Sequence, residues 1–224
     1  MAAHDEPKQL GQRKVGSAAK VMRKVLDMAI EGAAGMPGAR TSAAGHLGKK
    51  LHREEAIDAL VSQHVGLAGA QGFATNVGGG LTMAVSIPAN MVGVSVIQSR
   101  MVAGIAHLRG YDINDPRVRS AILMCLLGEP TATALIENHE LPSTPMAIAT
   151  APAFDEALDN QIAEQVLNQL GAMIGGKKLP LLIGKRIPLL GGGVGAVTDG
   201  YQTFAIATYA RRQFVDRRRA VTRD

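Results

Sequence analysis

The chain has 224 residues, a length at which one substantial domain buries about 70% of the surface that the unfolded chain exposes. It contains four Phe, three Tyr and no Trp but 26 Gly, so its core must be built from aliphatic side chains and closely approaching backbones. The single cysteine excludes a disulfide within the chain. The basic segments lack the interleaved aromatic residues that stack on bases, which argues against nucleic-acid binding.

Both ends of the chain are basic. Residues 1–24 hold six Lys and Arg against two acidic residues, and residues 211–224 hold six Arg against two. Such ends beside an apolar body favour an anionic lipid surface, to which each cationic side chain contributes about 1 kcal/mol. The alternative is that they are solvated ends that keep the protein soluble. The arginines expected at the membrane surface are Arg211, Arg212, Arg217, Arg218 and Arg219.

The N-terminal region combines a basic arm with one amphipathic helix. Residues 1–16 are predicted to form the arm, and because its sequence is charged and has no long apolar run, no secretory signal is expected. Ser17 is the predicted cap of the helix, which ends in the glycine-rich stretch 32–38. A flexible segment rich in Gly, Ala and Ser is predicted to continue to Leu51.

The most distinctive feature is that no Lys, Arg, Asp, Glu or His occurs from Val65 to Ser99. A continuous helix of this length would be about 50 Å long, more than a bilayer needs, but the triple glycine 78–80 divides it and Pro88 interrupts its second half. The run therefore predicts an apolar helical hairpin, with one helix beginning near Arg53 and the other ending at Gly110. The sequence leaves open whether this hairpin is buried in the protein or inserted in a bilayer.

The C-terminal half is also predicted to be helical. Asp115 and Pro116 form a start signal, a capping carboxylate followed by a proline at the first helical position. No segment shows strand-like alternation. The predicted helices span residues 116–127, 129–145, 154–174 and a last stretch from Val194 into the arginine tail, with an Ala- and Pro-rich connector at 146–154.

A second triple glycine, at 191–193, follows an apolar segment as the first one does, and it predicts a second hairpin. We expect small residues such as Gly79 and Gly191 at close crossings of the helices. The predicted fold class is therefore all-α, a single helical domain built around two glycine-rich apolar hairpins. Its predicted parts are a basic arm at residues 1–16, the helical domain at 17–215 and an arginine-rich tail at 216–224.

Two glycine-rich stretches approximate nucleotide-binding motifs. Residues 171–178 lack the Ser or Thr that a phosphate-binding loop needs for magnesium, and residues 191–196 have too little chain after them to complete a dinucleotide-binding sheet. The six histidines show no metal-ligand spacing, and the apolar neighbours of Cys125 suppress its thiolate. The sequence therefore predicts no metal site and no cofactor.

Polar residues within the apolar segments form the candidate ligand site. A carboxylate such as Asp199 between apolar runs is costly unless it is paired, and Arg100, directly after the uncharged run, is its expected partner. These residues form either a buried network that fixes helix register or the polar floor of a pocket for a lipid head group or small substrate. The predicted pocket residues are Thr75, Asn76, Gln98, Arg100 and Asp199.

The same segments resemble a known family. Residues 75–81, Ile87-Pro88, Gln98, Ile105-Ala106 and Gly110-Tyr111-Asp112 are similar to the central signature of the bacterial EcsC family. A second signature is matched by Lys185-Arg186-Ile187-Pro188, Gly191, Val194-Gly195-Ala196 and the stretch from Phe204 to Phe214. The family pattern has Asn where this chain has Asp199. The resemblance implies a helical, often membrane-associated bacterial protein, first named for its neighbourhood with an ABC transporter, and supplies no established reaction or catalytic residue.

Charge, composition and resemblance together predict a membrane-associated or lipid-binding accessory protein, cytoplasmic and peripheral to the inner face of the membrane. One alternative is a hydrolytic enzyme whose site forms where Thr75 and Asn76, Gln98 to Arg100, and Asp199 converge. The other alternative is a homo-oligomeric scaffold that buries the glycine-rich faces between subunits. The expected partners are an anionic membrane surface or lipid and a second copy of the chain, and no nucleic acid is expected.

Overall fold

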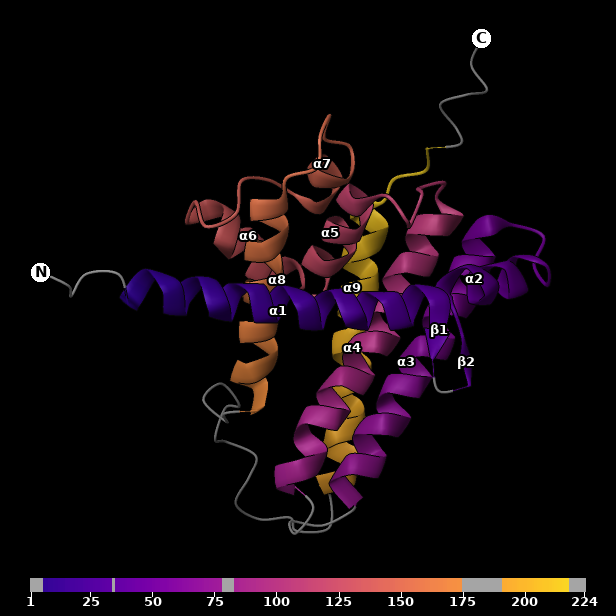
Figure 1. Cartoon of the computed structure of the whole chain (residues 1–224). Helices are drawn as coiled ribbons and strands as arrows, with labels where there is room; N and C mark the ends of the chain where they lie inside the picture. The colour runs from indigo at the N-terminus through magenta and orange to yellow at the C-terminus, as the bar shows by residue number, and fades with distance from the viewer. Residues whose placement is uncertain (1–5, 34, 78–82, 175–190, 218–224) are drawn as a thin grey trace, which may run out of the picture.

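The computed structural model describes residues 6–33, 35–77, 83–174 and 191–217, which Figure 1 shows in colour. This part of the chain is mostly helical and contains one sheet of two short antiparallel strands, so the predicted all-α single domain is confirmed. The elements are α1 (Glu6–Glu31), β1 (Gly32–Ala33), β2 (Met36–Pro37), α2 (Ala39–Leu47), α3 (Arg53–Val77), α4 (Met83–Leu108), α5 (Pro116–Cys125), α6 (Glu129–Glu137), α7 (Pro145–Ala149), α8 (Glu156–Ile174) and α9 (Gly191–Gln213).

Helices α3 and α4 form the first predicted hairpin. A Cβ placed on Gly93 would lie 2.0 Å from Nε2 of Gln71, and one placed on Gly104 would lie 2.7 Å from a methyl carbon of Leu60. Both distances are shorter than real Cβ contacts, so the missing side chains allow the two helices to approach closely. Of the glycines predicted at such crossings, Gly79 and the surroundings of Gly191 lie outside the described residues.

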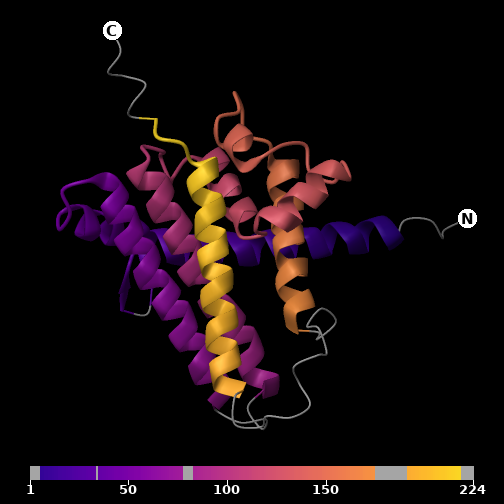
Figure 2. The same ribbon diagram turned by 180° about the vertical axis from the view of Figure 1, so that it is seen from behind.

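The helix after the second triple glycine, α9, packs mainly against a helix that is distant in sequence. Helix α9 lies along α3 and also contacts α4, whereas α8, the helix that precedes it in sequence, packs against α1 and α5 (Figure 2). At the α3–α9 contact, a Cβ on Gly200 would lie 3.8 Å from Val65, an ordinary contact distance. A triple glycine before a helix therefore does not determine its packing partner. The partner depends on how well the whole faces of two helices fit together.

Helix α1 begins at Glu6, well before Ser17, the predicted cap, so much of the predicted arm is helical. Pro7 does not prevent this, because a proline in the first turn lacks only an N–H that has no helical partner. The helix crosses one face of the molecule and packs against α4 and α8 (Figure 1). Nη2 of Arg23 donates to Oδ2 of Asp159 in α8 at 2.9 Å, and Ser120 in α5 donates to the other oxygen at 2.6 Å.

The segment after α1 is more ordered than the predicted flexible connection. Strands β1 and β2 pair antiparallel, and Gly32 begins the first with φ +102°, a conformation that strains other residues. Two-residue strands are too short to show an alternating pattern, which is why the sequence gives no sign of them. Ala39 and Ala43 are fully buried and hold α2 against the body.

Helix α5 lies at the centre of the core. As predicted, Asp115 caps it, with Oδ1 accepting the backbone N–H of Arg117 at 2.9 Å. Cys125 at its end is fully buried, and burial raises the pKa of its thiol, so it packs as a small apolar group. The predicted helix at 129–145 is shorter than expected, because α6 ends at Glu137, and the short α7 occupies part of the predicted connector.

The long helices give the molecule two distinct ends. The last turn of α3, the first turn of α4 and the first turn of α9 meet at one end, and the chain after α9 leaves from the other (Figures 1 and 2). Within the described ranges no single helix is both long and apolar enough to span a membrane. Helices α5 and α6 are long and apolar enough for a membrane span only when they are taken together, and the chain bends by 108° between them.

Candidate functional site

The predicted pocket residues in α4 point to two different neighbours. Gln98 is buried, and its Nε2 donates to Oγ1 of Thr203 in α9 at 3.1 Å. Arg100 is also buried, but its contacts are with α3 and β2. Residues two apart on a helix lie on different faces, so one pocket cannot be lined by both head groups here.

Arg100 is held by neutral groups. Its Nε donates to Nε2 of His64 at 2.9 Å, and its Nη1 donates to the carbonyl oxygen of Pro37 at 3.3 Å. The other nitrogen of His64, Nδ1, lies 2.7 Å from the carbonyl oxygen of Leu60, so His64 donates there and accepts from Arg100. Burial, and to a smaller extent the adjacent cation of Arg100, lower the pKa of His64 to about 4, which keeps the ring neutral.

The predicted ion pair between Arg100 and Asp199 is wrong. Arg100 has the partners just given, and no ion pair joins the two side chains, both of which the structure describes. Asp199 is half-buried in α9, and burial raises the pKa of its carboxyl. The next turn of the same helix face carries Thr203, the partner of Gln98. The contacts of Gln98 and Arg100 therefore fix the packing of α4 and do not form the predicted polar floor.

The remaining predicted pocket residues, Thr75 and Asn76, belong to the last turn of α3, and their side chains lie outside the described residues. Within the described part of the chain, the residues on which the hydrolytic alternative depends do not converge. That part also contains no group of three or more His, Cys, Asp and Glu side chains that could hold a metal ion.

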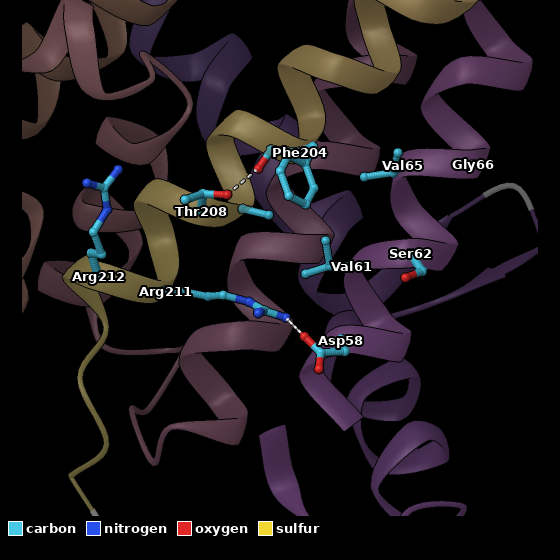
Figure 3. A pocket seen from close by; sticks show the side chains of 10 residues that line it. Asp58, Val61, Ser62, Val65, Gly66, Phe204, Thr208, Arg211 and Arg212 are labelled. Carbon is cyan, nitrogen blue, oxygen red and sulfur yellow. Dashed lines mark hydrogen bonds and ion pairs between the residues drawn. The ribbon is translucent and has the colours of Figure 1, made fainter. Parts of the chain in front are cut away.

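A hollow lies between α3 and α9. This α3–α9 groove has a volume of about 690 Å³ (Figure 3). Most of its wall is apolar, and at one end Nη2 of Arg211 reaches across to Oδ1 of Asp58 at 2.5 Å. The lining residues are Asp58, Val61, Ser62, Val65 and Gly66 from α3 and Phe204, Ala207, Thr208, Arg211 and Arg212 from α9.

The outer face of α9 exposes large apolar side chains. Val197 is 71% exposed, Tyr201 73% and Phe204 56%. Their spacing of four and three residues places them on one side of the helix, and we call these three residues the α9 stripe. Phe204 belongs to both the stripe and the groove wall. Singly exposed apolar residues are normal, but three of them along one side of a helix form a candidate interaction surface.

The arginines predicted at the membrane surface are largely engaged within the protein. Arg211 pairs with Asp58, and Arg212 pairs with Glu129 at 2.5 Å. The guanidinium of Arg217 lies 5.2 Å from the ring centre of Tyr111, and its backbone N–H donates to Arg109. Arg218 and Arg219 lie outside the described residues.

Sequence reasoning missed both His64 and the groove. His64 and Arg100 are the charged or titratable residues directly before and after the uncharged run, so a symmetric hairpin brings them together. The position of these two residues at opposite ends of the uncharged run is therefore a sequence signal for their contact. The groove has no comparable signal, because it depends on the packing of α9 against α3.

Comparison with protein-family models gives one match, the EcsC protein family, over residues 16–218. This range includes every described helix, apart from the first turns of α1. No curated protein and no solved structure matches the chain. Because the match covers nearly the whole sequence, the chain belongs to the EcsC protein family.

Proposed function

We propose that the protein is a membrane-associated accessory protein that contacts lipid through the outer face of α9, peripheral to the inner face of the membrane. The single observation that carries the proposal is the α9 stripe, Val197, Tyr201 and Phe204. A helix that exposes apolar side chains along one side can lie in the plane of the interface with those side chains among the acyl chains. The aromatic rings of Tyr and Phe also suit this position, because their bodies are apolar.

The stripe supplies enough apolar area for reversible attachment. Fully burying one such side chain is worth about 1.5–3 kcal/mol, so the exposed fractions of these three together give about 3–6 kcal/mol. This energy is typical of a peripheral protein and far below that of a spanning helix. Helix α9 lies on the outside of the molecule with both its flanks open, which lets the stripe approach a flat surface (Figure 2).

The arginines near the end of α9 add a smaller electrostatic contribution. Arg211 and Arg212 already pair with Asp58 and Glu129, so an anionic surface must compete with these partners. Exposed ion pairs are worth about 0.2–1 kcal/mol and exchange readily. We therefore expect apolar contact to set the affinity and anionic lipid to raise it moderately at low salt.

Vesicle sedimentation tests the proposal. The double variant Val197→Asp/Tyr201→Asp should partition to mixed neutral and anionic vesicles at least tenfold more weakly than the parent. The matched control is Leu51→Asp/Met146→Asp, which adds the same charge at exposed apolar residues outside α9 and should bind like the parent. Equal binding by the two double variants would refute the proposal.

Two further measurements separate the rival interpretations. Carbonate should release the native protein from membranes, and resistance to it would show an integral protein. If a second copy of the chain covers the stripe instead of lipid, the double variant should change the oligomeric state in light scattering. An unchanged mass together with lost vesicle binding supports lipid contact.

A further inference from the structure

We propose that the α3–α9 groove binds the aliphatic chain of a free fatty acid, with the carboxylate at Arg211. The inference rests on the proposed function and deepens it, because it names a lipid class and a site. Phe204 is shared by the groove and the α9 stripe, so the groove opens at the surface proposed to meet lipid. A chain leaving the membrane would enter it without crossing water.

The groove has the size and lining of a site for one apolar chain. Its volume of about 690 Å³ lies within the range of about 300–1,000 Å³ typical of small-ligand sites. Val61 and Val65 of α3 lie opposite Phe204 of α9, so the long sides of the groove are aliphatic and aromatic (Figure 3). Gly66 adds no side chain, which leaves the space beside Val65 open.

The charged end of the groove has an unfilled binding geometry. An arginine presents Nε and Nη2 as one edge that a carboxylate can engage with both oxygens. Asp58 takes only Nη2 of Arg211, while Nε is buried and has no hydrogen-bond partner among the described residues. At Arg23, by contrast, both N–H groups of this edge have a partner, because Nε and Nη2 donate to the same oxygen, Oδ2 of Asp159.

A ligand carboxylate can therefore make a better contact with Arg211 than Asp58 does. The side chain of Asp58 is 66% exposed, so it can turn to water at little cost when the ligand arrives. A cation would leave Nε without an acceptor, and a hydroxyl offers one uncharged oxygen where a carboxylate offers two charged ones, so neither fits this edge of Arg211 as well. The charge at this end selects a monoanion, and the volume of the α3–α9 groove suits a single chain.

Direct binding of dodecanoate below its micelle concentration, measured by calorimetry with the full chain and no vesicles, tests the site. Affinity should rise about fourfold for each methylene added from octanoate to dodecanoate, as expected for progressive burial of the chain. Dodecanol and dodecyltrimethylammonium should bind at least tenfold more weakly than dodecanoate. Equal affinities for the three head groups would overturn the assignment to Arg211.

Two glycines provide a matched pair of variants for the groove. A Cβ at Gly66 meets nothing within 4 Å, so Gly66→Leu fills the groove without a clash and removes a weak helix former. Gly45 in α2 is equally open and does not line the groove, so Gly45→Leu is the control. Dodecanoate binding should fall at least tenfold in the first variant and stay unchanged in the second. Equal binding in both variants would overturn the proposal.

A second pair of variants tests the head-group contact. Arg211→Gln should weaken dodecanoate at least tenfold while leaving dodecanol unchanged. Arg40→Gln is the control, because Arg40 forms an exposed ion pair of the same kind with Asp112 away from the groove. If Arg211→Gln weakened the acid and the alcohol equally, the carboxylate contact would be wrong.

The two proposals fail separately. Val197 and Tyr201 do not line the groove, so their double variant should lose vesicle binding and keep dodecanoate binding. Gly66→Leu should lose dodecanoate and keep vesicle binding. Failure of dodecanoate to bind the parent chain would remove the groove assignment and leave the stripe to its own test.

Discussion

Helices α4 and α9 are both apolar and glycine-containing, yet they use their apolar residues in opposite ways. In α4, Met101 and Ile105 are fully buried. In α9, the stripe residues stand in solvent, while the opposite side of the helix, with Ile206 and Ala210, is buried. Apolar composition therefore indicates where a helix can be buried, and only the packing of its neighbours decides which face remains outside. The exposed face of α9 is the one that needs a functional explanation.

The largest expected effect comes from truncating one large side chain in α4 and one in α9, which compares the buried helix with the exposed stripe. Met101→Ala removes a fully buried side chain and should lower the free energy of unfolding by about 2–5 kcal/mol. Phe204→Ala removes a side chain that is mostly in water, so it should cost no more than about 1 kcal/mol. Urea denaturation measures both changes. A loss at Phe204 as large as that at Met101 would mean that the α9 stripe is covered.

The buried side of α4 should also make stability depend on pH through His64. Its pKa is about 4 in the folded protein and 6.5 when unfolded, so the unfolded chain binds a proton first. The contribution of neutral His64 to the free energy of unfolding is fully present above pH 6.5. The free energy of unfolding should fall by about 3 kcal/mol as the pH drops from 6.5 to 4.

His64→Gln provides the control for this dependence, because glutamine offers an acceptor to Arg100 and does not titrate. Denaturation of both proteins across the same pH range makes the comparison. The variant should lose stability less steeply between pH 6.5 and pH 4. Parallel curves for the two proteins would show that His64 does not titrate as the buried contact with Arg100 requires.

The smallest effect concerns Asp199, which lies between the buried and exposed faces of α9. Burial raises the pKa of this carboxyl, so the charged form is disfavoured above its ordinary pKa and the folded protein gains stability as the pH falls. Asp199→Asn should raise the free energy of unfolding at pH 7 by no more than about 1 kcal/mol, because solvent screens the half-buried group. The difference in the free energy of unfolding between the variant and the parent should shrink near pH 3. A variant clearly less stable than the parent at pH 7 would contradict this prediction.

Much of the fold could be predicted from local signals. Asp115 and Pro116 start α5 as predicted, and the uncharged run folds into the predicted hairpin. The register of the hairpin, which was not predicted from the sequence, is symmetric: the pairs Leu60 with Gly104, His64 with Arg100, and Gln71 with Gly93 are each equidistant in sequence from position 82. Hairpins bring such positions together because both helices rise equally per residue.

The candidate site could not be predicted in the same way. Asp199 and Arg100 were predicted to pair because each is costly to bury alone, but His64 and a backbone carbonyl satisfy Arg100 instead. The groove and the α9 stripe depend on α9 packing against α3, far away in sequence. No periodicity within α9 reveals that choice, because either an inward or an outward apolar face fits its sequence.

Site-specific fluorescence tests most directly whether the exposed face of α9 meets lipid. An environment-sensitive probe is attached to Tyr201→Cys, with Leu51→Cys as the control at a 93% exposed position. The native Cys125 is fully buried and its raised pKa suppresses labelling. On adding vesicles, the emission at position 201 should brighten and shift to shorter wavelength, while position 51 should remain unchanged. An unchanged spectrum at 201 on vesicles that bind the protein would contradict lipid contact through α9.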